Sequence, residues 1–385
     1  MGQRQLFLST VAFAISFALW GLISGLAPRF RVLYGLSELQ TAVAVAVPVL
    51  LGALFRIPMG VLTDRYGGRI VFTLLLTFGI VPPAAIALFH SYAVLVASGL
   101  FLGSAGSSFA IGIAFNTRWF PPERQGLALG IFGAGNIGQS VAVFGAPLIA
   151  KHFGWEAVFW SFGTLSLLWA AIFWSFARDA GPPRETSLRH IIDVLLRRRL
   201  SWMLAFFYFI TFGGFVALGI YLPILLKGQF GLSLEDAGFR TAGFIVLATA
   251  MRPLGGWLAD RIGGTRVLTI VFGIIMLCSL CLMSTNLTLF SIGALGSAAM
   301  LGLGNGAVFK LVPALFSEDV GTVTGLVGAL GGLGGFFPPL ALGALKQATG
   351  SYAIGFLLLG IFALLALNLT RSLGWRATSG EVPAP

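Results

Sequence analysis

Charged residues are scarce in this sequence: only 10% of its 385 residues are Asp, Glu, Lys or Arg, whereas 57% are hydrophobic. A soluble domain carries about 25% charged residues, so this composition excludes a soluble globular protein. A spanning helix needs roughly 20 apolar residues, and windows of that length fill almost the whole chain. The sequence therefore indicates a polytopic membrane protein, and its 52 glycines fit closely packed membrane helices.

Cysteine and histidine are scarce too, with two and three residues respectively. Cys278 and Cys281 stand among leucine and methionine in one apolar segment, with no second cysteine pair and no histidine nearby. His90, His152 and His190 fall in predicted loops or at span ends. We therefore expect no metal site and no cofactor. Because the spans also lack a nucleophile–base pair, we do not expect an enzyme.

Twelve apolar segments predict an all-α membrane protein with twelve transmembrane helices. The first apolar run, from Leu6 to Leu26, is too long for a cleavable signal peptide, so we count it as a helix. The predicted spans are residues 8–27, 38–62, 70–89, 93–115, 126–150, 157–177, 201–226, 236–259, 267–285, 287–314, 321–345 and 353–371.

The positions of lysine and arginine predict the orientation of the chain. If the N-terminus is cytoplasmic, most of these cations fall in cytoplasmic loops, as the positive-inside rule requires. We therefore expect both termini in the cytoplasm. The net charge of +11 then reflects topology, and its scatter over short loops argues against a nucleic-acid partner. The cations expected outside are Arg29, Arg31, Lys151, Lys227, Arg240 and Lys346.

Two pairs of segments repeat along the chain. "RIPMGVLTDRYGG" (56–68) matches "RPLGGWLADRIGG" (252–264), and "ERQGLALGIFG" (123–133) matches "EDVGTVTGLVG" (318–328). The repeat predicts an N-terminal six-helix bundle over 1–177 and a C-terminal one over 201–385. They are joined by the polar segment 178–200, in which 188–199 suits either a helix on the membrane surface or a plain linker.

Two repeated halves with a substrate-binding site between them near mid-membrane are typical of transporters. The stretch "GVLTDRYGGR" between spans 2 and 3 resembles the signature loop of the major facilitator superfamily, and the second half repeats most of it. The resemblance implies that superfamily's fold, with two pseudo-symmetric six-helix bundles. In that family the loop helps to latch the cytoplasmic side, which implies gating roles for Asp64, Arg65, Asp260 and Arg261.

Two arginines are expected deep in the membrane. Arg56 precedes Asp64 by eight residues, which places it roughly 12 Å deeper along the helix, and Arg252 repeats this position. Burying one charge at the bilayer centre costs about 2.5–3.5 kcal/mol on insertion scales. All 13 acidic residues fall in loops, at span ends or in the tail, so the sequence predicts an anionic cargo as the counterion. The repeat would bring the two guanidinium groups face to face across a central cavity, each suited to an oxyanion.

The stretch "GIFGAGNIGQS" (130–140) contains G-x-G-x-x-G, but an all-helical chain has no βαβ unit, so dinucleotide binding is excluded. Together with "GLVGALGGLGGFFPP" (325–339) it strongly resembles the two signature motifs of the nitrate/nitrite porter family, which includes NarK-type transporters. The glycines that carry the resemblance are Gly133, Gly135, Gly138, Gly328, Gly331 and Gly332.

This resemblance implies a transporter of nitrate, nitrite or both in the bacterial cytoplasmic membrane. We expect a monomer, although the sequence itself does not reveal the oligomeric state. In that family one arginine in each of helices 2 and 8 binds the anion, which implies that aromatic faces would sandwich the flat ion. The matching positions here are Arg56, Arg252, Asn136, Phe109, Tyr208 and Phe212.

Lys310 is the one other charge set back from the predicted span ends. Beside two arginines it could release and regain a proton, which would make the protein a nitrate/proton symporter. Alternatively it extends towards the cytoplasmic end near Pro313, and the protein exchanges nitrate for nitrite. An exchanger of organic phosphates or small carboxylates is the other open possibility.

Overall fold

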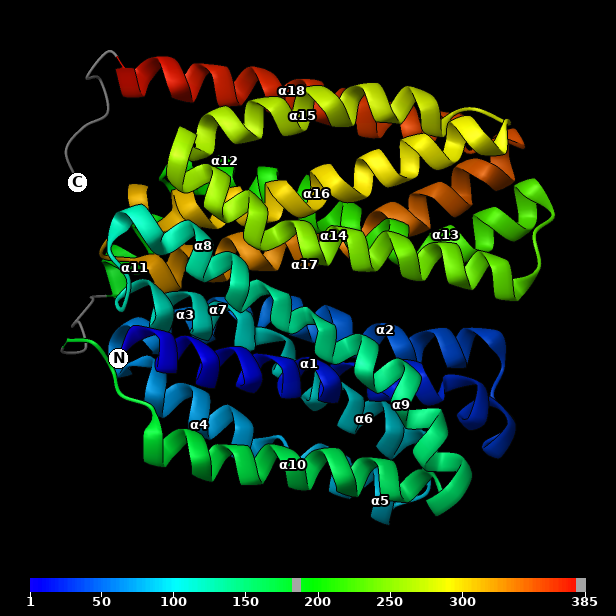
Figure 1. Cartoon of the computed structure of the whole chain (residues 1–385). Helices are drawn as coiled ribbons and strands as arrows, with labels where there is room; N and C mark the ends of the chain where they lie inside the picture. The colour runs from blue at the N-terminus through cyan, green and yellow to red at the C-terminus, as the bar shows by residue number, and fades with distance from the viewer. Residues whose placement is uncertain (182–187, 379–385) are drawn as a thin grey trace. The chain divides into compact units, whose positions relative to one another are not determined.

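The structure, a computed structural model, describes residues 1–181 and 188–378. Its regular elements are helices (Figure 1). The α-helices are α1 Gly2–Leu33, α2 Glu38–Leu54, α3 Arg56–Tyr66, α4 Gly68–Phe78, α5 Val81–Leu88, α6 Tyr92–Leu102, α7 Ser108–Thr117, α8 Pro122–Gly133, α9 Ile137–Phe153, α10 Trp155–Phe176, α11 Leu188–Leu196, α12 Arg199–Tyr208, α13 Gly214–Phe230, α14 Leu234–Ile262, α15 Gly264–Leu282, α16 Leu287–Leu315, α17 Val320–Thr349 and α18 Ala353–Thr378.

Within the described residues, 12 helical segments are long and apolar enough to cross a membrane. The predicted all-α fold with twelve spans is therefore confirmed. The helices expose large apolar side chains, such as Leu74 at 64% and Leu148 at 63%, which suit contact with lipid. The polar segment between spans 6 and 7 contains α11, so a helix does form there.

The chain divides into two compact units. Unit 1 comprises Met1–Pro121, Ile131–Arg198 and Asp319–Ala329, and unit 2 comprises Pro122–Gly130, Arg199–Glu318 and Leu330–Pro385, of which only the described residues are discussed. The predicted division at residues 178–200 stays a prediction.

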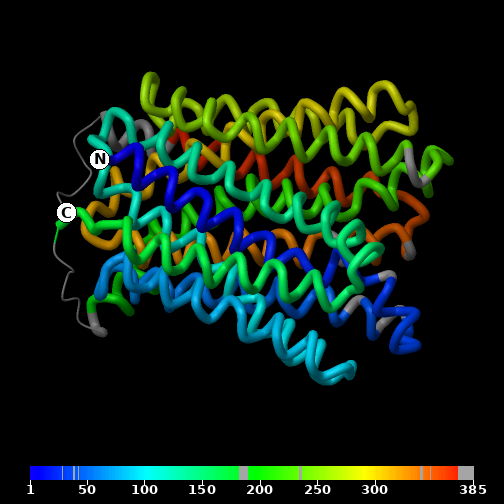
Figure 2. Tube along the Cα trace, turned by 60° about the horizontal axis from the view of Figure 1, so that its bottom comes forward, coloured from blue at the N-terminus to red at the C-terminus, as the bar shows by residue number. Residues whose placement is uncertain are grey.

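Glycines set the packing in unit 1, where α1 runs along α9 and α10 packs against α4 (Figures 1 and 2). A methyl group on Gly25 would lie 3.1 Å from Val143 Cα, and one on Gly138 would overlap the Ala14 carbonyl. The backbones of α1 and α9 therefore lie almost in contact. Close approach of this kind explains the high glycine content.

In unit 2, α16 packs against both α14 and α15, and α15 packs against α18 (Figure 1). Side chains at Gly302 and Gly306 would overlap the carbonyl oxygens of Ala248 and Arg252 on α14. The backbone of α14 around Arg252 is thus held by its neighbour.

The signature loop has the same backbone form in both halves. Gly67, between α3 and α4, has φ +87°, and Gly263, between α14 and α15, has φ +90°. Residues with a side chain rarely adopt this conformation, which explains why both copies of the loop have glycine there.

Candidate functional site

Arg56 is the first residue of α3, directly after Phe55 interrupts the helix of span 2. Its side chain is buried, with 4% exposure. The guanidinium group donates from Nε to the Gly106 carbonyl at 3.1 Å and from Nη1 to the Gly328 carbonyl at 2.6 Å. Its Cζ lies 5.9 Å from the centre of the Phe109 ring. Unit 1 therefore brings together three predicted site residues: Arg56, Phe109 and Gly328.

Phe109 belongs to a buried aromatic group. Its ring centre lies 5.5 Å from that of Phe13 and 5.9 Å from that of Phe132, and the two rings of Phe109 and Phe132 are stacked. A side chain at Gly112 would overlap the Phe132 ring. This packing fixes the plane of Phe109 beside Arg56.

Asn136 is also in unit 1, in a short 3-10 stretch, Ala134–Asn136, that joins α8 to α9. It is 8% exposed, and its side-chain Oδ1 is buried without a hydrogen-bond partner among the described residues. A buried polar atom in this state costs free energy, and such groups are common at functional sites. The flanking Gly135 and Gly138 let this stretch pack against α1.

Arg252 lies inside α14 and is 2% exposed. Its Nη2 donates to the Tyr208 hydroxyl at 3.2 Å, and its Cζ lies 5.8 Å from the centre of the Phe212 ring. The rings of Tyr208 and Phe212 stack at 4.9 Å with an angle of 6° between their planes. Unit 2 therefore brings Arg252, Tyr208 and Phe212 together.

The two units repeat one arrangement. In unit 1 the Cζ of the buried Arg56 lies 5.9 Å from the centre of the Phe109 ring. In unit 2 the Cζ of the buried Arg252 lies 5.8 Å from the centre of the Phe212 ring. Contacts of a guanidinium group with an aromatic face are favourable, more so when desolvated. Each arrangement combines planar cationic donors with a flat apolar surface, which suits a planar anion.

Irregular helices surround these residues. The 3-10 segment Gly103–Ser107 provides Gly106 and ends just before Phe109, Asn136 closes another 3-10 segment, and the π-helix Phe209–Gly213 contains Phe212. Departures of this kind inside α-helices frequently mark functional sites. They were not predicted from the sequence.

Two of the signature glycines in α17 lie against predicted site residues. A side chain at Gly328 would lie 2.9 Å from Arg56 Cδ, and one at Gly331 would overlap the Tyr208 ring. Gly332 and Gly133 are buried in α17 and at the end of α8. Glycine is therefore needed at Gly328 and Gly331 because a larger residue would displace a site residue.

The signature-loop carboxylates bind helix backbones. Asp64 accepts hydrogen bonds from Gly321 N at 3.0 Å, Thr322 N at 2.7 Å and the Thr322 hydroxyl at 2.9 Å. These amides are in the first turn of α17, which has free N–H groups and the positive end of the helix dipole. In unit 2, Asp260 accepts from Gly126 N at 2.9 Å and Leu127 N at 2.8 Å.

Lys310 lies beside this second carboxylate. Its Nζ is 2.7 Å from Asp260 Oδ1 and also donates to the Pro122 carbonyl. The gating-loop arginines are exposed instead: Arg65 lies over the Tyr66 ring at 5.4 Å and Arg261 over the Trp257 ring at 4.1 Å. The ion pair places Lys310 with the loop residues.

Two neighbours of the site were not predicted from the sequence. The Phe309 ring meets Tyr208 edge-on at 4.7 Å, and the Gly106 carbonyl binds Arg56. The chain has 35 phenylalanines, and only its position directly before Lys310 could have indicated that Phe309 lies near the site. Backbone carbonyls give no sequence signal at all.

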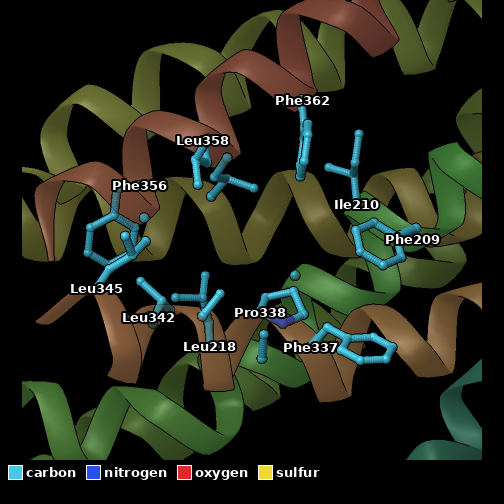
Figure 3. A pocket seen from close by; sticks show the side chains of 15 residues that line it. Phe209, Ile210, Leu218, Phe337, Pro338, Leu342, Leu345, Phe356, Leu358 and Phe362 are labelled. Carbon is cyan, nitrogen blue, oxygen red and sulfur yellow. The ribbon is translucent and has the colours of Figure 1, made fainter. Parts of the chain in front are cut away.

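A hollow in unit 2 is distinct from these residues. It is lined by apolar side chains of the π-helix, α13, α17 and α18, among them Phe209, Phe337 and Phe362 (Figure 3). Among the side chains that the structure describes, no charged one lines it, so it does not suit an anion.

The sequence matches the Major Facilitator Superfamily over residues 8–339 and again over 226–379. The chain belongs to the major facilitator superfamily. It is 41% identical over 373 residues to the nitrite extrusion protein of Bacillus subtilis (strain 168), an alignment that covers 97% of this chain and 94% of that one. It is 36% identical over 401 residues to the probable nitrate/nitrite antiporter NarK1 of Thermus thermophilus, covering 94% and 89% of the two chains.

A solved structure has the same fold as this chain. The human organic anion transporter MFSD10 superimposes with a TM-score of 0.78 at 18% identity, covering 96% of this chain and 99% of that one. The resemblance inferred from the two glycine motifs is thus confirmed, and the protein is a multi-pass membrane transporter rather than an enzyme.

Proposed function

We propose that this facilitator carries nitrate and nitrite across the bacterial cytoplasmic membrane by alternating access. The observation that supports it most is the repeated pairing of a buried arginine with an aromatic ring, Arg56 with Phe109 and Arg252 with Phe212. The relatives named above as a nitrite extrusion protein and a nitrate/nitrite antiporter support the same cargo.

The chemistry of the site suits these ions. Nitrate is small, planar and weakly hydrated for an anion, so an apolar aromatic surface costs it less desolvation than it would cost phosphate. The arginine forks bind the oxygens at its edge, and the Phe109 and Phe212 rings offer flat faces. Asn136 supplies an amide, whose NH2 group is a further donor.

Exchange of one anion for another follows from the burial of the arginines. A charge buried in the membrane is costly, and an anion beside it reduces that cost. A carrier that has released its anion is therefore disfavoured during the conformational change, whereas one that has bound the counter-substrate is not. Obligatory exchange of nitrate for nitrite is the expected result.

The signature loops act as latches in this proposal. Asp64 holds the first turn of α17, and Asp260, with Lys310, holds α8. Any conformational change that moves either helix segment out of its unit must break these hydrogen bonds. The carboxylates therefore stabilise one state of the transport cycle and contribute nothing to anion recognition.

We expect both termini in the cytoplasm.

Counterflow in proteoliposomes tests the proposal. Vesicles loaded with nitrite should accumulate labelled nitrate, whereas empty vesicles should take up at least tenfold less, and an organic phosphate in excess outside should not compete. Equal uptake into empty vesicles would contradict obligatory exchange. Competition by the organic phosphate, with no effect of nitrite, would assign the carrier to a different anion.

A further inference from the structure

A positively charged pocket lies in unit 1, at the ends of α1 and α9. It is lined by Gly25, Leu26 and Arg29 of α1 and by Pro147, Ala150 and Lys151 of α9. On each helix these residues are spaced three or four positions apart, with one direct neighbour, so they share one face. We call this hollow the α1–α9 pocket.

The shape of the pocket follows from the sequence. Gly21 and Gly25 bring α1 close to the backbone of α9 at Ala142 and Val143. Beyond this contact α9 carries Pro147, which has no N–H group and disturbs the helix. The hollow past this point has a volume of about 430 Å³.

The pocket is cationic. Arg29 and Lys151 are exposed, and among the described residues neither forms a salt bridge with a carboxylate. Glu156, five residues after Lys151, lies 3.9 Å from His90. Burial and the Glu156 charge raise the pKa of Tyr34, which follows the end of α1.

We propose that the α1–α9 pocket is a peripheral binding site for a small inorganic oxyanion, where nitrate or nitrite is collected before transport. The inference rests on the proposed function. Arg29 and Lys151 both line a hollow that is large enough for an anion that keeps part of its hydration shell. Cations in such a cleft raise the local anion concentration and the rate of entry.

Binding in this pocket is weak, as a collecting site requires. Both helices present their C-terminal ends here, α1 ending at Leu33 and α9 at Phe153. The carbonyl groups at a helix C-terminus carry a partial negative charge, which opposes the attraction of the two cations. The anion is therefore drawn in but released readily.

Direct binding is measured by broadening of the 15N-nitrate NMR signal with purified protein. An Arg252→Gln background removes the buried site in unit 2. Adding Arg29→Gln and Lys151→Gln should reduce the remaining broadening at least twofold, whereas Arg31→Gln should not, because Arg31 is exposed on the same helix but does not line the pocket. Unchanged broadening in the double replacement would overturn the inference.

Transport kinetics give the second readout. In an otherwise wild-type chain, Arg29→Gln with Lys151→Gln should raise the KM for nitrate about three- to tenfold with kcat unchanged. The charge-preserving pair Arg29→Lys with Lys151→Arg should stay within twofold of wild type, and so should Arg31→Gln. An equal rise in Arg31→Gln would show general surface attraction and overturn the site.

The two proposals fail in different ways. If the carrier does not transport nitrate or nitrite at all, wild-type counterflow fails while the pattern of NMR broadening still reports on the pocket. If the pocket is not a site, wild-type counterflow succeeds and the variants match it.

Discussion

Tyr208 accepts a hydrogen bond from Arg252, with Nη2 3.2 Å from the hydroxyl oxygen, and its ring stacks on Phe212 at 4.9 Å. A single buried tyrosine therefore orients both the cation and the aromatic surface proposed to hold the anion. Its own position is set by Phe309 at its edge and by the close approach of Gly331.

Tyr208→Phe tests this orientation. The substitution removes the hydroxyl but keeps the ring and its stacking. A hydrogen bond to a charged group contributes about 1.5–3 kcal/mol, so the KM for nitrate should rise at least tenfold. The thermal midpoint in detergent should change little, because the packing is kept. A KM equal to that of wild type would show that the hydroxyl does not position Arg252.

Gly331→Ala tests the close approach of α17 to Tyr208. The added methyl group would overlap the tyrosine ring, so the ring must move and counterflow should fall at least tenfold. Gly343→Ala on the same helix is the matched control, because its methyl group would lie 3.5 Å from Tyr221 Oη, an ordinary contact. Full activity of Gly331→Ala, or an equal loss in Gly343→Ala, would contradict this reading.

Asp64→Asn and Asp260→Asn test the latches by hydrogen–deuterium exchange. An amide side chain has one acceptor oxygen and adds a donor that faces the backbone N–H groups. The Gly321 and Thr322 amides should exchange at least tenfold faster in Asp64→Asn, and the Gly126 and Leu127 amides in Asp260→Asn.

Each of these variants serves as the control for the other, because the two carboxylates hold different helices. Exchange that stays slow at the predicted amides, or that rises at both places in both variants, would refute independent latches.

Lys310→Gln separates proton coupling from the latch. The ion pair with Asp260 favours a latch role for Lys310 over a role as proton carrier. We therefore expect Lys310→Gln to leave the pH dependence of nitrate uptake unchanged and to lower the thermal midpoint. In a double-mutant cycle, Asp260→Asn and Lys310→Gln together should destabilise by less than the sum of the single changes. Loss of pH-driven uptake with normal counterflow would instead identify Lys310 as the proton carrier.

The fold could be predicted from the sequence because bilayer thickness and hydropathy determine spanning helices. Twelve spans were predicted, and the residues that the structure describes contain 12 helical segments suited to crossing a membrane. The breaks inside them were not predicted: Phe55, the 3-10 turns before Phe109 and at Asn136, and the π-helix at Phe212 all lie within stretches that were predicted as continuous spans. Local propensity alone does not determine where a helix breaks, because tertiary packing can override it.

The site was predictable only in part. Arg56 and Arg252 stood out because a charge in an apolar run is costly, and the motif resemblance indicated their aromatic neighbours. The hydrogen bonds of Arg56 to the carbonyls of Gly106 and Gly328 could not be predicted, since the backbone carries no residue-specific signal. The partner of Lys310 was missed because Asp260 lies fifty residues earlier, at the end of another helix.

The role of the two arginines as anion ligands is tested most directly by replacing each with lysine and measuring labelled-nitrate counterflow into nitrite-loaded proteoliposomes. Lysine keeps the positive charge but cannot form the planar two-donor fork. We predict that Arg56→Lys and Arg252→Lys each lower the rate at least a hundredfold while the protein stays folded. Wild-type rates in either variant would contradict the assignment.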